Sequence, residues 1–347
     1  MTIDYGRYLF AELEKGFEKA DVTGVVQFIF ENPKQEFYIT VNNSSLEFTD
    51  GLFESPESLV LMSEFAVKNI VKMATTYDPR VIEFSSSMDI TGNKKLANFL
   101  CNLVMRPAEE TLNELELAKK ITLENEKITD IPVLHYPKSK DLVESIKTYQ
   151  PLLMKGILDE WDLSQWSIES LLEKFGKYQV VSYLPWTIED YIKDGASKYS
   201  GGTGLPGVLM SDFKNPKLLQ DTAILGFPQL WLGSSKTLEK RSVTGLHFDC
   251  VHGVLCQVFG RKKILMYPPY EEKYLYPYRA FNQYRSCWTG PDVIDNQNYP
   301  LFKNANPIEI ILNPGDALYI PFGWYHCVYA LDPVMSISYP LKSIKLE

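Results

Sequence analysis

The chain has few histidines and no closely paired cysteines, and both shortages narrow the kinds of site it can hold. Only four of its 347 residues are histidine, and its five cysteines form no Cys-x-x-Cys pair. A cysteine zinc site or a disulfide scaffold is therefore not expected. The odd number of cysteines fits reduced thiols, so we expect a cytoplasmic protein.

Long apolar runs and an excess of basic residues are also missing. No run approaches the roughly 18–20 residues needed to cross a bilayer, and the first 20 residues carry acids where a signal peptide would be apolar. The net charge of −9 argues against nucleic acid as the main partner, because phosphate binding needs a basic face. The sequence thus predicts a globular protein with no transmembrane segment and no nucleic-acid partner.

The two halves of the chain differ in composition. All six tryptophans lie at or beyond Trp161, and a length of 347 residues favours two domains of ordinary size. The first hundred residues alternate strand-like and helix-like segments, which predicts an α+β domain with helices on one face of a mainly antiparallel sheet. The segments are a helix over about 6–20, strands in VVQFIF, EFYITVNN, SLEFTDG, SLVLMS and VIEFSSSMDITGN, and helices in SEFAVKNIVKMA and KKLANFLCNLVM.

This order of elements resembles the sterol carrier protein type-two domain over residues 1–106. The similarity lies in a strand before the DG turn at 50–51, the strand–helix step LVLMSEFAVKNI, and the ending SSSMDITGNKKLANFL. It implies a lipid or acyl ligand in an apolar tunnel. A docking or dimerising module with a filled core is the alternative, and residues 107–130 are predicted to be a helical connector.

The second half contains short strand-like runs separated by turns, with little helix between them. This spacing predicts an all-β antiparallel barrel or double-stranded jelly roll over residues 131–347, with flanking helices. The runs are LWLGSS, TGLHFD, HGVLCQVFG, RKKILMYPP, IEIILNPGDALYIPFGWYHCVYAL and VMSISYPLK.

Two of these strands carry metal-ligand types. His247 and Asp249 are two residues apart, so on a strand they share a face. His326 follows the turn in NPGDALYIPFGWYH, and a barrel can bring its strand alongside the first. Two histidines and one carboxylate on one face leave coordination positions open, as iron(II) oxygenases require. Zinc with a bound water could use the same ligands, so a hydrolase stays an alternative.

A lysine pair begins the strand RKKILMYPP. Strand alternation sends Lys262 to the side of Ile264 and Met266, and Lys263 to the other side. A lysine on an inward face is costly unless it meets an anion. Lys262 is therefore a candidate anchor for an acidic cosubstrate.

Taken together, TGLHFDCVHGVLCQVFGRKKILMYPP, NPGDALYIPFGWYHCVY and the upstream YQPLLMKGILDEWDLSQWSIESLLEKFG resemble the Jumonji-C, cupin-8-like family of oxygenases over about residues 128–342. The resemblance implies iron(II), 2-oxoglutarate and O2 as cofactor and cosubstrates. It makes His247, Asp249 and His326 the catalytic iron ligands. Lys262, thirteen residues after Asp249, would pair with the distal carboxylate of 2-oxoglutarate.

The same resemblance implies two weaker cosubstrate contacts, from Thr244 and Ser338. No clear tyrosine stands at the family's further cosubstrate position, near GVLMSDF. His252 has no counterpart among the ligands; a fourth-ligand or substrate contact is open, and a structural role is preferred. We expect Asp316 to be a turn acid, and Cys250 and Cys256 to be small buried side chains.

The function expected from these features is hydroxylation of an unactivated C–H bond. A protein or peptide side chain is the preferred substrate, with a carrier-borne small molecule as the other choice. Chromatin demethylation ranks second, because no histone-reader module or basic face is evident. The alternative from another class is a non-catalytic lipid-binding or scaffolding protein with a vestigial cupin half.

Overall fold

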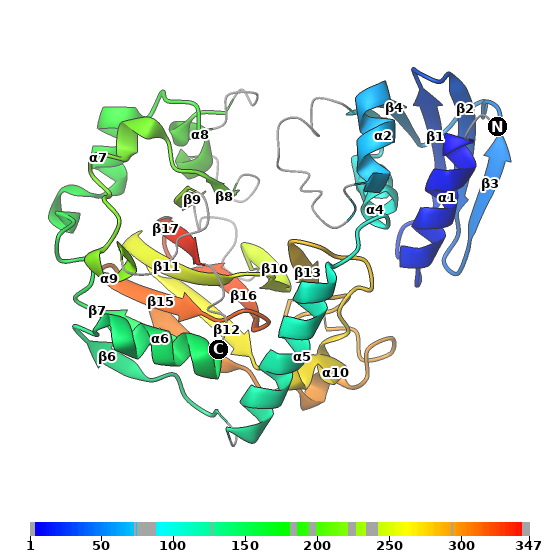
Figure 1. Cartoon of the computed structure of the whole chain (residues 1–347). Helices are drawn as coiled ribbons and strands as arrows, with labels where there is room; N and C mark the ends of the chain where they lie inside the picture. The colour runs from blue at the N-terminus through cyan, green and yellow to red at the C-terminus, as the bar shows by residue number, and fades with distance from the viewer. Residues whose placement is uncertain are drawn as a thin grey trace. The chain divides into compact units, whose positions relative to one another are not determined.

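The computed structural model describes residues 4–72, 74, 88–125, 128–180, 186–193, 199–220, 227–233, 242–292 and 294–341 (Figure 1). The chain divides into two compact units. Unit 1 contains residues 1–112 and 278–285, and unit 2 contains residues 113–277 and 286–347. Within the described part of the chain, no helix is both long and apolar enough to span a membrane.

Unit 1 is built on a five-stranded sheet in the order β3-β2-β1-β4-β5. Its neighbouring strands are antiparallel except for β1 and β4, which run parallel. This is the α+β arrangement predicted from the sequence. The elements are α1 (Tyr5–Gly16), β1 (Gly24–Phe30), β2 (Gln35–Val41), β3 (Leu46–Asp50), β4 (Ser58–Met62), α2 (Glu64–Lys72), β5 (Met88–Gly92) and α4 (Lys94–Asn102).

The core of unit 1 comes from strand alternation and is rich in aromatic rings. Phe28, Phe30 and Phe37 are almost fully buried, and the Phe28 and Phe37 rings stack 5.1 Å apart. Leu9 and Leu13 of α1 close over them, and only a small gap, lined also by Met62 and Cys101, remains beside them.

Residues 278–285 belong to unit 1 although they come late in the chain. The Arg279 backbone N–H donates to Glu18 Oε2 at 2.7 Å, and Asn282 Nδ2 donates to the Ala74 carbonyl at 3.2 Å. Unit 1 is therefore discontinuous in sequence.

Unit 2 contains two sheets that face each other. One has seven strands in the order β6-β7-β15-β11-β17-β9-β8, and the other has the order β13-β10-β16-β12-β14, in which the division into units falls within the edge strand β13. Most pairs are antiparallel, as the predicted jelly roll requires. The strands are β6 (Val133–His135), β7 (Leu152–Lys155), β8 (Tyr199–Gly204), β9 (Gln229–Gly233), β10 (Thr244–Asp249), β11 (His252–Phe259), β12 (Lys262–Tyr267), β13 (Tyr284–Ser286), β14 (Ile308–Leu312), β15 (Asp316–Ile320), β16 (Tyr325–Ala330) and β17 (Val334–Leu341).

Helices cover the outer face of the seven-stranded sheet. Leu142, Leu171 and Ile188 belong to one buried cluster with Val254 and Tyr339 of that sheet. A second cluster between the sheets includes residues of both. The helices are α5 (Glu109–Glu124), which crosses the boundary between units, α6 (Ser139–Thr148), α7 (Ile168–Phe175), α8 (Ile188–Lys193), α9 (Lys217–Gln220) and α10 (Glu272–Leu275), with 3-10 turns at Leu163–Gln165, Gly207–Leu209, Pro269–Glu271 and Phe302–Asn304.

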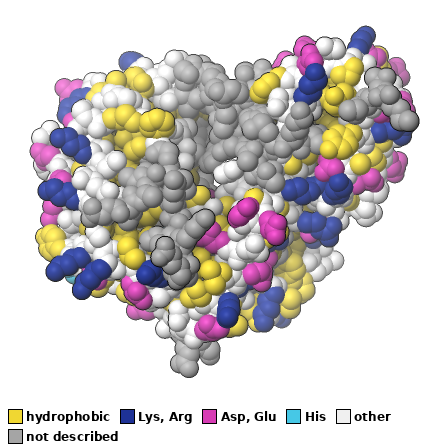
Figure 2. All heavy atoms as spheres, viewed as in Figure 1, with side chains coloured by type: hydrophobic (Ala, Val, Ile, Leu, Met, Phe, Trp, Pro, Cys, Tyr) yellow, Lys and Arg dark blue, Asp and Glu magenta, His cyan; other side chains and the backbone are white. Residues whose placement is uncertain are grey.

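The described surface mixes residue types. On the face drawn in Figure 2, acidic and basic side chains are interspersed with apolar ones. The described side chains on this face thus form no single block of one charge.

The β11–β12 turn requires glycine at position 260. Gly260 has φ +68, and a Cβ there would lie 2.1 Å from the Pro333 carbonyl oxygen. We expect Gly260→Ala to lower the unfolding free energy by at least about 1–2 kcal/mol, because it adds left-handed strain to a backbone clash. Denaturant unfolding measures this. Gly207→Ala is the control, because its Cβ meets nothing within 4 Å; equal losses in both variants would contradict the expectation.

Candidate metal centre

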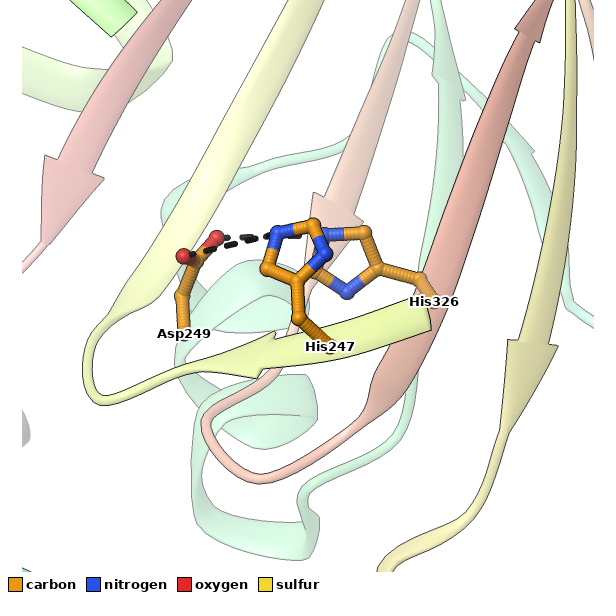
Figure 3. A group of neighbouring side chains, drawn as sticks. All are labelled: His247, Asp249 and His326. Carbon is orange, nitrogen blue, oxygen red and sulfur yellow. Dashed lines mark ion pairs between the residues drawn. The ribbon is translucent and has the colours of Figure 1, made fainter. Parts of the chain in front are cut away.

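Pairing of β10 with β16 brings the two candidate histidines together. His247 lies opposite His326 in the antiparallel register, and their ring centroids are 4.5 Å apart. Asp249 ends β10, with Oδ1 3.9 Å from His247 Nε2 and Oδ2 3.8 Å from His326 Nε2 (Figure 3). The three ligand atoms lie within 4.8 Å of one another, which is compatible with one shared metal ion.

Backbone carbonyls orient both imidazoles. His247 Nδ1 lies 2.6 Å from the Gly245 oxygen, and His326 Nδ1 lies 3.0 Å from the Trp324 oxygen. Because a carbonyl oxygen can only accept, each Nδ1 carries the proton and each Nε2 keeps its lone pair. Metal-binding histidines are commonly fixed in this way, and here both Nε2 atoms face Asp249.

The electrostatics favour a divalent cation. Burial, followed by the neighbouring His247, lowers the pKa of His326 to about 4, so its ring is neutral at pH 7. Asp249 supplies the carboxylate of the ligand set. Its side chain is 43% exposed, against 5% for His326, so the site is most accessible on the Asp249 side.

A register shift in β10 places Thr244 on the same face. Thr244 and His247 are three residues apart, yet they lie opposite Val328 and His326, which are two apart. A bulge of this kind turns side chains toward one face and is frequent near active sites. The Thr244 hydroxyl oxygen is buried and has no hydrogen-bond partner among the described residues.

Lys262 lies on the same face of the five-stranded sheet. It pairs with Ala330, four residues along β16 from His326. At about 3.3 Å per residue, Thr244 is about 7 Å and Lys262 about 13 Å along the sheet from the level of His326. Along the strand direction, Thr244 is therefore at a level between His326 and Lys262, although β10 and β12 flank β16 on opposite sides.

The Lys262 ammonium is buried without a counter-charge. The residue is 1% exposed and forms no ion pair with any described residue. Burial lowers its pKa to about 7. Lys263, by contrast, faces the other side, 4.6 Å from the centroid of the Tyr329 ring. A desolvated ammonium of this kind favours binding of an anion.

Tyr199 is a candidate site residue that the sequence did not single out. Its ring centroid is 5.8 Å from Lys262 Nζ, and its hydroxyl is buried with no partner in the described part of the chain. Gly233 makes room for it, because a Cβ there would lie 2.3 Å from the ring. Tyr199 precedes the GVLMSDF segment, near which the family resemblance implies a cosubstrate-binding tyrosine. The only sequence signal is its position on a short strand.

The remaining candidates have other surroundings. The Ser338 hydroxyl already accepts from Trp231 Nε1 at 2.7 Å and lies 3.3 Å from Gln229 Oε1, so a cosubstrate contact from it stays a prediction. Asp316 accepts from the Asn313 backbone N–H at 3.0 Å, as a turn acid does. Cys256 is buried, but Cys250 is only half-buried, which corrects the expectation for that residue.

His252 is outside the triad. Its Nδ1 accepts from the Phe322 backbone N–H at 3.1 Å, and its Nε2 lies 3.3 Å from Glu114 Oε1. Both ring nitrogens therefore have partners within the protein, which argues against a fourth ligand. Trp324 is fully buried and donates from Nε1 to the Tyr149 carbonyl at 2.7 Å.

Comparison with known proteins relates the second half of the chain to a family. The cupin-like domain matches residues 209–339. Lysine-specific demethylase 8 of Xenopus tropicalis is 27% identical over 237 residues, covering 61% of this chain and 52% of that protein. JmjC domain-containing protein D of Dictyostelium discoideum is 40% identical over 108 residues, 31% and 23% of the two chains. Lysine-specific demethylase JMJ30 of Arabidopsis thaliana is 36% identical over 109 residues, 31% and 24% of the two chains.

These matches cover the proteins unequally. The alignments span about half the length of the first relative and about a quarter of the other two. Jumonji-C proteins use iron(II), 2-oxoglutarate and O2, and the triad has the two-histidine, one-carboxylate donor set suited to iron(II).

The first test concerns Lys262 as an anion-binding residue, and it measures the stability of the ligand-free protein. The pKa of about 7 in the folded chain is below that of an exposed lysine, so between pH 7 and 10 the unfolded chain binds more protons. Stability contributed by Lys262 thus falls as pH drops through this window. We expect Lys262→Met to have a higher Tm than the unaltered chain at pH 6, by about 2–4 °C for each kcal/mol gained in unfolding free energy. This difference in Tm should be smaller at pH 9.

The second test is 2-oxoglutarate binding by the same variants. Affinity should fall as pH rises above about 7, because the ammonium loses its proton. Lys262→Met should weaken binding and remove this pH dependence in calorimetric titrations. Lys263→Met is the matched control, since that side chain faces away. Equal behaviour of the two variants would show that Lys262 does not hold the dicarboxylate.

Proposed function

We propose that this chain is an iron(II)- and 2-oxoglutarate-dependent oxygenase of the Jumonji-C type that hydroxylates a C–H bond. The cupin-like match over residues 209–339 and the similarity to Jumonji-C proteins support the proposal. One observation carries the proposal. The His247–Asp249–His326 triad and the buried Lys262, which forms no ion pair with any described residue, lie on the same sheet face.

The residues divide into two groups. His247, Asp249 and His326 would hold the iron through two Nε2 atoms and one carboxylate. When bound, the iron with 2-oxoglutarate and O2 supplies the oxidising chemistry, in which 2-oxoglutarate becomes succinate and CO2 as the substrate gains oxygen. Lys262 would pair with the distal carboxylate, with the Thr244 and Tyr199 hydroxyls as further donors. Burial excludes water from this end, which strengthens the ionic contact.

We propose a protein or peptide side chain as the substrate. The names of two relatives given above state a lysine-specific demethylase, which is an activity on a protein side chain. Hydroxylation of an N-methyl group leads to its loss as formaldehyde, so demethylation and stable hydroxylation share the same oxidation. A lipid or acyl ligand in unit 1 receives no support from the described core, where aromatic rings occupy the interior.

The proposal predicts the effect of removing one ligand. Asp249→Ala deletes the carboxylate that faces both imidazoles, so iron binding should weaken. We expect succinate formation from 2-oxoglutarate to fall at least about a hundredfold, consistent with loss of a required metal ligand. Succinate is measured with the purified full chain, iron(II) and air.

Asp332→Ala serves as the control for this experiment. Asp332 is an acid in the β16–β17 turn, beyond the end of β16 that is opposite His326, and its carboxylate pairs with Arg261 at 2.7 Å. Its variant should retain normal turnover. Wild-type succinate formation by Asp249→Ala would refute the assignment, and activity with zinc in the absence of 2-oxoglutarate would favour a hydrolase.

A separate measurement identifies the class of product. Candidate peptides and methylated-lysine peptides are incubated with the chain, iron(II), 2-oxoglutarate and air, and analysed by mass spectrometry. Gain of one oxygen indicates stable hydroxylation, and loss of a methyl group indicates demethylation. Metal-dependent oxidation of a free small molecule, with no change in any peptide, would overturn the choice of a protein substrate.

A further inference from the structure

A buried network of polar contacts in unit 2 is centred on His252. His252 is 1% exposed and begins β11, three residues after Asp249. Its Nε2 lies 3.3 Å from Glu114 Oε1 on helix α5. Glu114 also accepts from the Tyr149 hydroxyl, and Tyr319 Oη lies 2.7 Å from His252 Nδ1. The network joins one helix to three segments of the barrel.

The contacts define which ring nitrogen carries the proton. The Phe322 backbone N–H can only donate, so His252 Nδ1 must accept from it at 3.1 Å. The ring proton is therefore on Nε2, the nitrogen that lies 3.3 Å from Glu114 Oε1. Attraction between this polar N–H and the carboxylate oxygen holds the ring against helix α5.

This single side chain connects the two turns that deliver the metal ligands. His252 follows the turn after Asp249, and Phe322 lies in the turn before His326. The bond from the Phe322 N–H to His252 Nδ1 therefore sets the spacing between these turns. Phe248, between His247 and Asp249, adds a ring contact 6.0 Å from Phe322 and another 5.0 Å from Tyr325.

Helix α5 also packs on the second of these turns. Gly323 has φ +79, and a Cβ on it would lie 3.2 Å from Leu115 Cδ1 and 3.7 Å from Ala118 Cβ. Leu115 and Ala118 are almost fully buried. The helix thus contacts the turn twice, by apolar packing at Gly323 and by the Glu114–His252 contact.

We propose that Glu114 and His252 are positioning residues for the metal centre: helix α5 holds, through them, the two turns that carry Asp249 and His326 at the separation the metal requires. The inference rests on the metal centre proposed above. It assigns a role to a helix that lies outside the 209–339 match and is far from the triad in sequence. Neither residue contacts the metal, the cosubstrate or the substrate in this account.

The test is metal affinity in the full chain, measured without turnover. Mn(II) is titrated calorimetrically, and Co(II) absorption reports the coordination geometry. We expect Glu114→Ala and His252→Ala each to weaken Mn(II) binding on the order of tenfold, as loss of supporting hydrogen bonds does at metal sites, and to alter the Co(II) spectrum. Glu114→Gln keeps an acceptor for the Nε2 proton, so its affinity should return to within about threefold of the unaltered chain.

Two further variants separate positioning from general stability. Glu116→Ala is the matched control, because Glu116 is on the same helix, its side chain is 73% exposed, and it pairs with Lys119. His252→Asn keeps an acceptor near the Phe322 N–H and should bind Mn(II) more tightly than His252→Ala. If His252→Ala does not fold, the inference is tested with the other three variants, which are Glu114→Ala, Glu114→Gln and His252→Asn.

The outcomes are distinguishable. A lower Tm with unchanged Mn(II) affinity and Co(II) spectrum in Glu114→Ala and His252→Asn would show that the network is only structural, and would overturn the inference. Failure of the unaltered chain to bind Mn(II) or Co(II) would instead overturn the metal centre, and with it the proposed function.

Discussion

The antiparallel pairing of β10 with β16 is the contact on which the candidate site depends. It places His247 opposite His326 and leaves both Nε2 atoms facing Asp249. A slip of one residue would turn one imidazole to the opposite face of the sheet. The bulge between Thr244 and His247 then adds a buried hydroxyl to the same face, which regular alternation would have turned away.

Charge is arranged at two ends of this face. The triad contributes one carboxylate and is partly open to solvent at Asp249, whereas the Lys262 side chain is fully buried. The Asp249 carboxylate would offset the charge of a divalent cation at the triad. The Lys262 ammonium would offset the charge of a ligand carboxylate at the other end of the face. Desolvation of Lys262 destabilises the ligand-free state, and binding of an anion would offset that cost. This sheet face is thus suited to a ligand that carries negative charge at the Lys262 end.

The support of the site extends beyond the strands that carry it. Glu114, Leu115 and Ala118 come from a helix that begins in unit 1 and ends in unit 2, and they contact His252 and the Gly323 turn of the barrel. A metal site tolerates only small errors in ligand spacing. Residues that hold the two ligand-bearing turns against helix α5 therefore affect metal binding without contacting the ion. Gly233 acts in a similar way for Tyr199, because its missing side chain leaves space for the ring.

Much of the architecture and the triad could be predicted from local sequence, because strand alternation and turn residues act over a few positions. The jelly roll, the α+β unit, the shared face of His247 and Asp249, and the inward side of Lys262 follow from period-two patterns. Tertiary structure alone decided the register that joins His247 to His326, the bulge at Thr244, the ring of Tyr199 beside Lys262, and the Glu114–His252 contact. It also decided that residues 278–285 group with unit 1. These contacts join residues far apart in the chain, and no local pattern encodes which distant partner a strand or helix meets.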